Sequence, residues 1–100
     1  MNARIITIDA AALRRQVWEL VESGEVPPLS QADCPHPPIV DAAGDICDGM
    51  HRVAGMIAAG ETAIACVTCD DTNLLGEIAD AEHPAQQANA IRKIYDALQL

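Results

Sequence analysis

One short segment in the middle of the chain concentrates residue types that could do chemistry, Asp48-Gly49-Met50-His51-Arg52. An apolar run precedes it and a run of helical composition follows, so it is expected to join a strand to a helix. The first N–H groups of such a helix have no intrahelical partner and carry the positive end of its dipole. Because Gly49 has no Cβ, a phosphate could approach this backbone, with His51 and Arg52 as further donors.

A purely structural interpretation of the same segment stays open. Asp48 could serve only as a helix cap, and His51 and Arg52 could lie on a solvated helix face. Asp48 could equally contact a metal ion that a bound nucleotide carries. The spacing of these residues does not choose between the two interpretations.

The four cysteines, Cys34, Cys47, Cys66 and Cys69, include one CxxC pair. The stretch Thr62 to Cys69 is expected to be a strand, which points residues i and i+3 to opposite faces. We therefore interpret the thiols as reduced and either buried or incidental. The alternative is a zinc site, for which the chain offers no second tight pair but four further ligands, Cys34, His36, Cys47 and His51.

Composition limits the classes of partner. The 100 residues carry a formal net charge of −9 and 2% aromatic residues. The negative charge disfavours binding to nucleic-acid phosphates and to an anionic membrane surface, and the few aromatic residues disfavour binding of bases by stacking. No apolar run approaches the roughly 18 residues of a membrane span, and the N-terminus does not resemble a signal peptide. A cytoplasmic protein is the expectation.

The pattern of apolar, Gly and Pro residues predicts one α+β domain over residues 1–100, a small mixed sheet with helices packed against it. The first half of the chain is expected to form a strand at Ile5–Ile8, a helix capped by Asp9 and ended by Gly24, and a Pro-rich loop over 27–38. A hairpin of Ile39-Val40 and Ile46-Cys47 follows, then a helix over Met50–Ala59 and a strand over Thr62–Val67. The last expected elements are a short helix capped within 70–72 and ending near Ala81, and a helix from Pro84 to Leu98. Trp18 is expected in the core or at an interface, because it adjoins the apolar helix stripe. A homodimer is an open expectation.

The segment from Asp48 to Ala54 resembles the phosphate-binding box of the ParB/sulfiredoxin superfamily. That box reads Gly-Glu-Arg-Arg-x-Arg-Ala in ParB proteins, Gly-Cys-His-Arg in sulfiredoxins and Asp-Gly-His-His-Arg in free serine kinases, the last being the most similar. The Pro-Ile-Val strand before the box, the strand after it and the helix from Pro84 also fit, so the resemblance covers about residues 4 to 98.

The resemblance implies a ParB/sulfiredoxin-like fold and a nucleoside triphosphate site, for ATP or CTP with Mg²⁺. It implies that Gly49, Met50, His51 and Arg52 bind the nucleotide, with Asp48 and His51 as catalytic residues. Met50 occupies the position of the sulfiredoxin cysteine, so sulfinic-acid reduction is excluded. The second nucleotide motif of ParB has no clear counterpart, and the general base is not identifiable.

Two hypotheses follow from the residues and the resemblance together. The first is a small nucleotide-binding domain that could hydrolyse the nucleotide or transfer a phosphoryl group. The alternative is a non-catalytic, partition-related regulatory module that binds a protein partner, which the strongly acidic composition favours. A nuclease is disfavoured, because one small basic cluster gives DNA little to bind.

Overall fold

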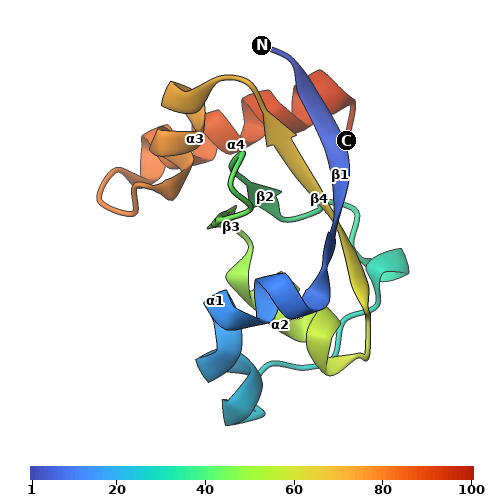
Figure 1. Cartoon of the computed structure of the whole chain (residues 1–100). Helices are drawn as coiled ribbons and strands as arrows, with labels where there is room; N and C mark the ends of the chain where they lie inside the picture. The colour runs from blue at the N-terminus through green and yellow to red at the C-terminus, as the bar shows by residue number, and fades with distance from the viewer.

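The computed structural model describes residues 1–100, which form a four-stranded mixed sheet and four helices, as Figure 1 shows. This confirms the expected α+β class. None of the helices is both long and apolar enough to cross a bilayer. The elements in chain order are β1 (Ala3–Asp9), α1 (Ala10–Ser23), a 3-10 turn η1 (Gln31–Asp33), β2 (Ile39–Val40), β3 (Ile46–Asp48), α2 (Met50–Ala58), β4 (Ala63–Cys69), α3 (Thr72–Ala79) and α4 (Pro84–Leu98).

The sheet has the strand order β1-β4-β2-β3. The long strands β1 and β4 pair antiparallel, with Ile6 opposite Cys66. The short strand β2 pairs parallel with β4 and antiparallel with β3. A parallel pair needs a long crossover, and here β3 and α2 supply it between β2 and β4. The topology therefore places the turn from β3 to α2 at the end of the edge strand β3.

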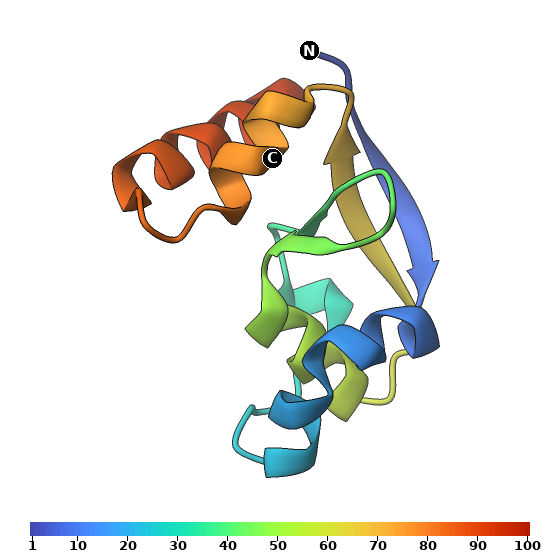
Figure 2. The ribbon, with the colours of Figure 1, turned by 60° about the vertical axis from the view of Figure 1, so that its left-hand side comes forward.

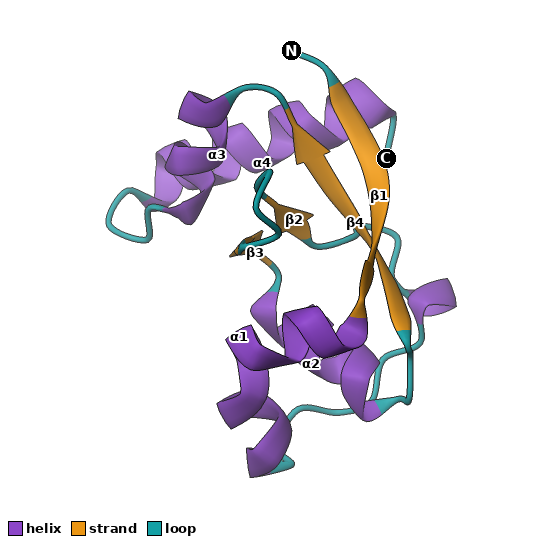
Figure 3. Cartoon of the chain, in the orientation of Figure 1, coloured by secondary structure: helices purple, strands orange, loops and turns teal.

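Successive residues of β4 supply two separate apolar clusters. Cys66 packs with α1 and α2, whereas Val67 and Cys69 pack with α3 and α4. Because side chains alternate along a strand, these clusters lie on opposite faces of the sheet. The two helical pairs accordingly lie on either side of β2 and β3 in Figures 2 and 3. The structure thus confirms that Cys66 and Cys69 point to opposite faces.

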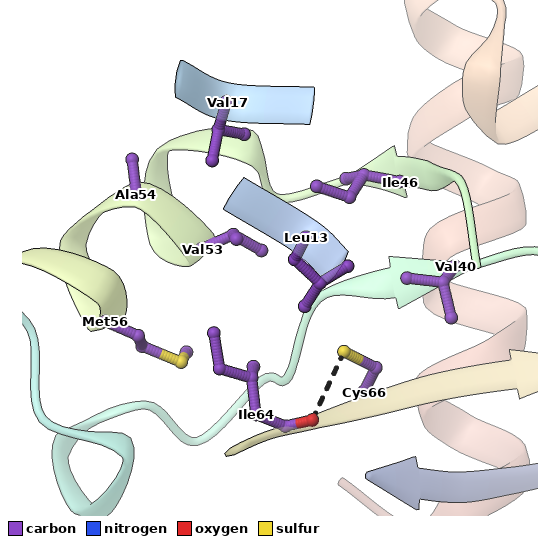
Figure 4. Close-up of a cluster of buried hydrophobic side chains, with 9 residues drawn as sticks. All are labelled: Leu13, Val17, Val40, Ile46, Val53, Ala54, Met56, Ile64 and Cys66. Atoms are coloured by element: carbon purple, nitrogen blue, oxygen red, sulfur yellow. Dashed lines mark hydrogen bonds between the residues drawn. The ribbon is translucent and has the colours of Figure 1, made fainter. Parts of the chain in front are cut away.

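The cluster under α1 and α2 is built from aliphatic side chains of five elements, as Figure 4 shows. Leu13 of α1, Val53 of α2 and Ile64 of β4 are all fully buried in it. The Cys66 thiol donates to the backbone oxygen of Ile64 at 3.6 Å, which satisfies its polar group inside the apolar cluster. This packing holds the start of α2, and with it the central segment, against the sheet.

Several helix ends differ from the sequence-based expectation. Asp9 precedes α1, but its side chain makes no capping hydrogen bond, so that part of the prediction was wrong. Asp71 is the side chain that caps α3, accepting from the N–H of Leu74 at 3.0 Å. Helix α3 ends at Ala79 instead of Ala81. Helix α1 is also kinked at Val17, whose φ of −128° and ψ of 18° are not helical, and no sequence signal indicated this.

The Pro-rich loop is fastened to α2 and β4 before it reaches β2. The N–H of Leu29 donates to the carbonyl of Gly55 at 2.9 Å, and a Cβ on Gly55 would meet the Pro27 oxygen at 2.9 Å. The side chain of Gln31 then bonds both the carbonyl of Ala63 and the N–H of Ala65, as a neighbouring strand would. These contacts fix the path of the loop that leads to His36 and Pro37.

Candidate functional site

Asp48, Gly49 and Arg52 meet at the turn from β3 into α2. Asp48 ends the strand, Gly49 precedes the helix at a φ of 101°, and Arg52 lies in the first helical turn. This φ belongs to the left-handed region, which glycine adopts without a steric penalty. The guanidinium of Arg52 folds back over Gly49, so that a Cβ there would lie 2.8 Å from Nη2. Glycine is therefore needed at this position for both its conformation and its small size.

The guanidinium of Arg52 joins three parts of the chain. Its Nη2 donates to Asp48 Oδ2 at 2.7 Å, and its Nη1 donates to the Tyr95 hydroxyl at 3.0 Å and to the His36 carbonyl. The Tyr95 hydroxyl in turn donates to the Pro37 carbonyl at 2.6 Å. The Pro-rich loop, the start of α2 and the helix α4 are thereby held together by one small polar network.

Two N–H donors of Arg52 are not used inside the chain. A guanidinium has donors on Nε and on both terminal nitrogens, and the bonds above leave Nε–H and one Nη2–H without a partner. Both nitrogens lie over Gly49, where a Cβ would be 2.8 Å from Nη2 and 3.0 Å from Nε. The network positions Arg52, and the absence of a side chain at Gly49 leaves the space beside these donors.

The charge of Arg52 is held in place by its surroundings. Burial lowers the pKa of its guanidinium, but the hydrogen bond to Tyr95 and the neighbouring Asp48 carboxylate outweigh burial and raise that pKa above its ordinary value. Burial also raises the pKa of the Tyr95 hydroxyl, and Arg52 offsets only part of that rise. At neutral pH the network therefore pairs a permanent cation with a neutral phenol.

An open cavity of about 410 Å³ lies beside this network, between the start of α2 and the helix α4. Two of the six basic side chains of the chain, Arg52 and Arg92, line it. The remaining lining combines acidic, aromatic and aliphatic side chains: His36, Asp48, Ala88, Ile91, Tyr95, Asp96 and Leu100. Cationic donors thus converge on an aromatic and aliphatic wall within a chain that is otherwise strongly acidic.

The structure divides the residues expected at the site. Asp48, Gly49 and Arg52 come together as described, and Asp48 and Arg52 line the cavity. His51 is exposed, bonds to no other side chain, and is not part of the cavity lining. Met50 points elsewhere, into a separate hollow beside Trp18. Met50, His51 and Arg52 are consecutive on α2, and successive side chains of a helix point about 100° apart.

Apart from Asp48 and Arg52, no residue of the cavity lining was expected at a nucleotide site. His36 was considered only as an alternative zinc ligand, and Tyr95 and Arg92 were not singled out. Tyr95 offered a usable signal, because a tyrosine in a buried stripe needs a hydrogen-bond partner for its hydroxyl. His36 also contacts it through its ring, with centroids 4.8 Å apart.

The thiols do not extend this site. All four cysteines are free, and no cluster of three or more His, Cys, Asp or Glu side chains could hold a metal ion. Burial raises the pKa of the Cys66 thiol to about 11, and burial together with Asp41 and Asp45 does the same for Cys47. Both thiols are therefore protonated, and weak nucleophiles, at neutral pH.

Comparison with known proteins gives no relative: no protein-family model, no curated protein and no solved structure matches the chain. The function must be argued from the site itself.

Proposed function

We propose that this domain binds a nucleoside triphosphate, ATP or CTP with its Mg²⁺, with the phosphates in the cavity between α2 and α4. The observation that carries the proposal is the pair of guanidinium groups, Arg52 and Arg92, that line one cavity in a chain of net charge −9. Two carboxylates, Asp48 and Asp96, line the same cavity, so phosphate binding would depend on the directed guanidinium donors and on the Mg²⁺ that the nucleotide carries, not on an excess of positive charge.

Each part of the site has a role in this proposal. The unused donors of Arg52 contact phosphate oxygens, and the first N–H groups of α2 lie in the same turn. Arg92 supplies a second cation from α4 and is bonded only to Asn89 at 2.6 Å, so it is free to move toward a ligand. The apolar lining from Ile91 and the ring of Tyr95 offers a surface for the nucleoside. The similarity of the Asp48–Ala54 segment to the ParB/sulfiredoxin box supports the same class of ligand.

Binding is better supported than turnover. Asp48, expected to take part in phosphoryl transfer, is committed to Arg52 at 2.7 Å, and His51 lies outside the cavity. His36 and Asp96 also line the cavity, but no hydrogen bond positions either side chain as a base. We therefore propose a nucleotide-binding domain in which hydrolysis or phosphoryl transfer would require Asp48 to leave Arg52. Phosphate release by the wild type, lost in Asp48→Asn with binding retained, would establish that activity.

Calorimetric and thermal-shift titrations with ATP, CTP, GTP, ADP and inorganic triphosphate, each with Mg²⁺, test the proposal. A ligand at about 100 times its Kd stabilises the native state by about 2.7 kcal/mol. Arg92→Ala is expected to weaken binding about tenfold without harming the fold. Arg14→Ala is the matched control, because it removes an equal charge from an exposed side chain on α1. If none of the five ligands binds, the proposal is wrong.

A non-catalytic module that binds another protein is the second candidate. The observation that favours it is the exposure of two large apolar side chains, Trp18 at 55% and Met50 at 45%, on a surface apart from the cavity. A pull-down or titration in which Trp18→Ala abolishes partner binding, with no response to nucleotide, would favour this function over the first.

A further inference from the structure

Trp18 and Met50 form an exposed apolar surface at the junction of α1 and α2. Together with Arg15 and Glu19 they border a hollow of about 320 Å³, and we call these four residues the Trp18 surface. Apart from residues at the chain ends, Ile5 is the one other large apolar side chain that is comparably exposed. An exposed tryptophan beside a methionine is the composition of an interaction site, where Trp most often contributes a large share of the binding energy.

The fold holds Trp18 outward by anchoring its two neighbours. Val17 is 2% exposed in the apolar cluster below α1. Gln16 donates from Nε2 to the Gly44 carbonyl at 2.9 Å and accepts at Oε1 from the N–H of Ile46 at 2.7 Å. Val17 is also the residue at which the helix is kinked, directly before Trp18. Because Gln16 and Val17 are both fixed, Trp18 cannot turn into the core without breaking these contacts.

The charged side chains beside Trp18 indicate which kind of partner would bind the Trp18 surface. Arg15 and Glu19 both border the hollow and lie one helical turn apart on α1. When two copies of α1 meet antiparallel about a two-fold axis, Arg15 of each copy lies opposite Glu19 of the other. A uniformly basic partner would oppose Arg15, and a uniformly acidic partner would oppose Glu19. The surface therefore complements itself in charge as well as in apolar character.

We propose that the Trp18 surface is an interface at which two copies of this chain form a symmetric dimer. The two indoles and the two Met50 side chains bury one another at the centre, and the Arg15–Glu19 pairs flank them. Each copy has a net charge of −9, so the dimer must form against long-range repulsion. Added salt, which screens that repulsion beyond about 8 Å, is accordingly expected to strengthen association.

Sedimentation velocity of the full chain, from about 5 μM to 1 mM in 150 mM salt, measures the association. The wild type is expected to shift from monomer to dimer across this range. Trp18→Ala is expected to raise the Kd at least about thirtyfold, the loss typical of a central interface tryptophan. Circular dichroism checks that the variant is folded. A wild type that stays monomeric throughout, or an unchanged Kd for folded Trp18→Ala, overturns the proposal in favour of a different partner.

Charge exchange tests the two-fold pairing independently. Arg15→Glu and Glu19→Lys each place like charges opposite one another and are expected to raise the Kd about tenfold. An equimolar mixture of these variants restores opposite charges only across the interface, so a heterodimer of near wild-type affinity is expected. The matched controls Arg14→Glu and Glu22→Lys change the same charges on α1 outside the hollow and should leave the Kd unaltered. If the mixture associates no better than either variant alone, the proposed pairing is wrong.

Discussion

Removal of one oxygen, by Tyr95→Phe, tests the polar network around Arg52. The substitution keeps the ring, which is 8% exposed in the α3–α4 cluster, and deletes only the hydroxyl. It removes two hydrogen bonds, one to the Pro37 carbonyl and one from the Arg52 guanidinium. The Pro-rich loop and α2 then lose their shared attachment to α4.

The expected loss follows from the two bonds. A bond between neutral groups contributes about 1 kcal/mol and one to a charged group about 1.5–3 kcal/mol. The side chain of Arg52 is 26% exposed, so water can replace part of its lost bond. We therefore expect a decrease of about 2 kcal/mol in the free energy of unfolding. In a domain of this size that lowers Tm by about 8–16 °C.

Urea unfolding followed by far-UV circular dichroism measures this loss, with Arg92→Ala as a control that should change stability by less than about 0.5 kcal/mol. A double-mutant cycle with Arg52→Ala separates the shared bond from the others, and a coupling energy near 1 kcal/mol is expected. A loss below about 0.5 kcal/mol for Tyr95→Phe, or additive effects in the cycle, would refute the reasoning that this network fastens the loop to α4.

Three further predictions concern other parts of the fold and are checked by the same unfolding measurements. Gly55→Ala is expected to destabilise the folded state by about 1–3 kcal/mol, because its Cβ would meet the backbone of the Pro-rich loop at 2.9 Å. Gly76→Ala should stabilise the folded state by about 0.5–1 kcal/mol, because Gly76 lies in α3 with open space around it. A change of the same sign for both variants would contradict this packing. Gln16→Ala should cost about 1–2 kcal/mol, because it leaves the N–H of Ile46 and the carbonyl of Gly44 without their partner, and a neutral result would show that water replaces both bonds. Burial raises the pKa of the Cys66 thiol from 9.0 to about 11. Between these two pH values the folded state keeps a proton that the unfolded state releases. The free energy of unfolding should therefore be unaffected below about pH 9 and should fall between pH 9 and 11. The pKa of the Cys47 thiol is raised to about 11 as well, so both thiols contribute to the decline. Cys66→Ala should remove only its own share, and an identical slope in this variant would exclude a contribution from Cys66.

Local patterns in the sequence were sufficient for most of the secondary structure. β-Branched runs predicted β1 and β4, apolar spacing predicted α1 and α4, and glycine and proline predicted several of the ends. The kink at Val17 could not be predicted, because it depends on where tertiary contacts hold Gln16 and Val17.

The sequence by itself determined that Asp48, Gly49 and Arg52 share one strand-to-helix turn, because their separation is short and glycine permits that backbone. Only the tertiary structure decided what surrounds them. Tyr95 and Arg92 lie forty residues or more from the turn along the chain, and His36 reaches it through a loop fastened to α2 and β4. Contacts of that range depend on how α4 packs across the sheet, which no local pattern encodes. Helix geometry turns Met50 away from the cavity, and the packing of α1 on α2 places it beside Trp18, so that one continuous motif contributes to two different surfaces.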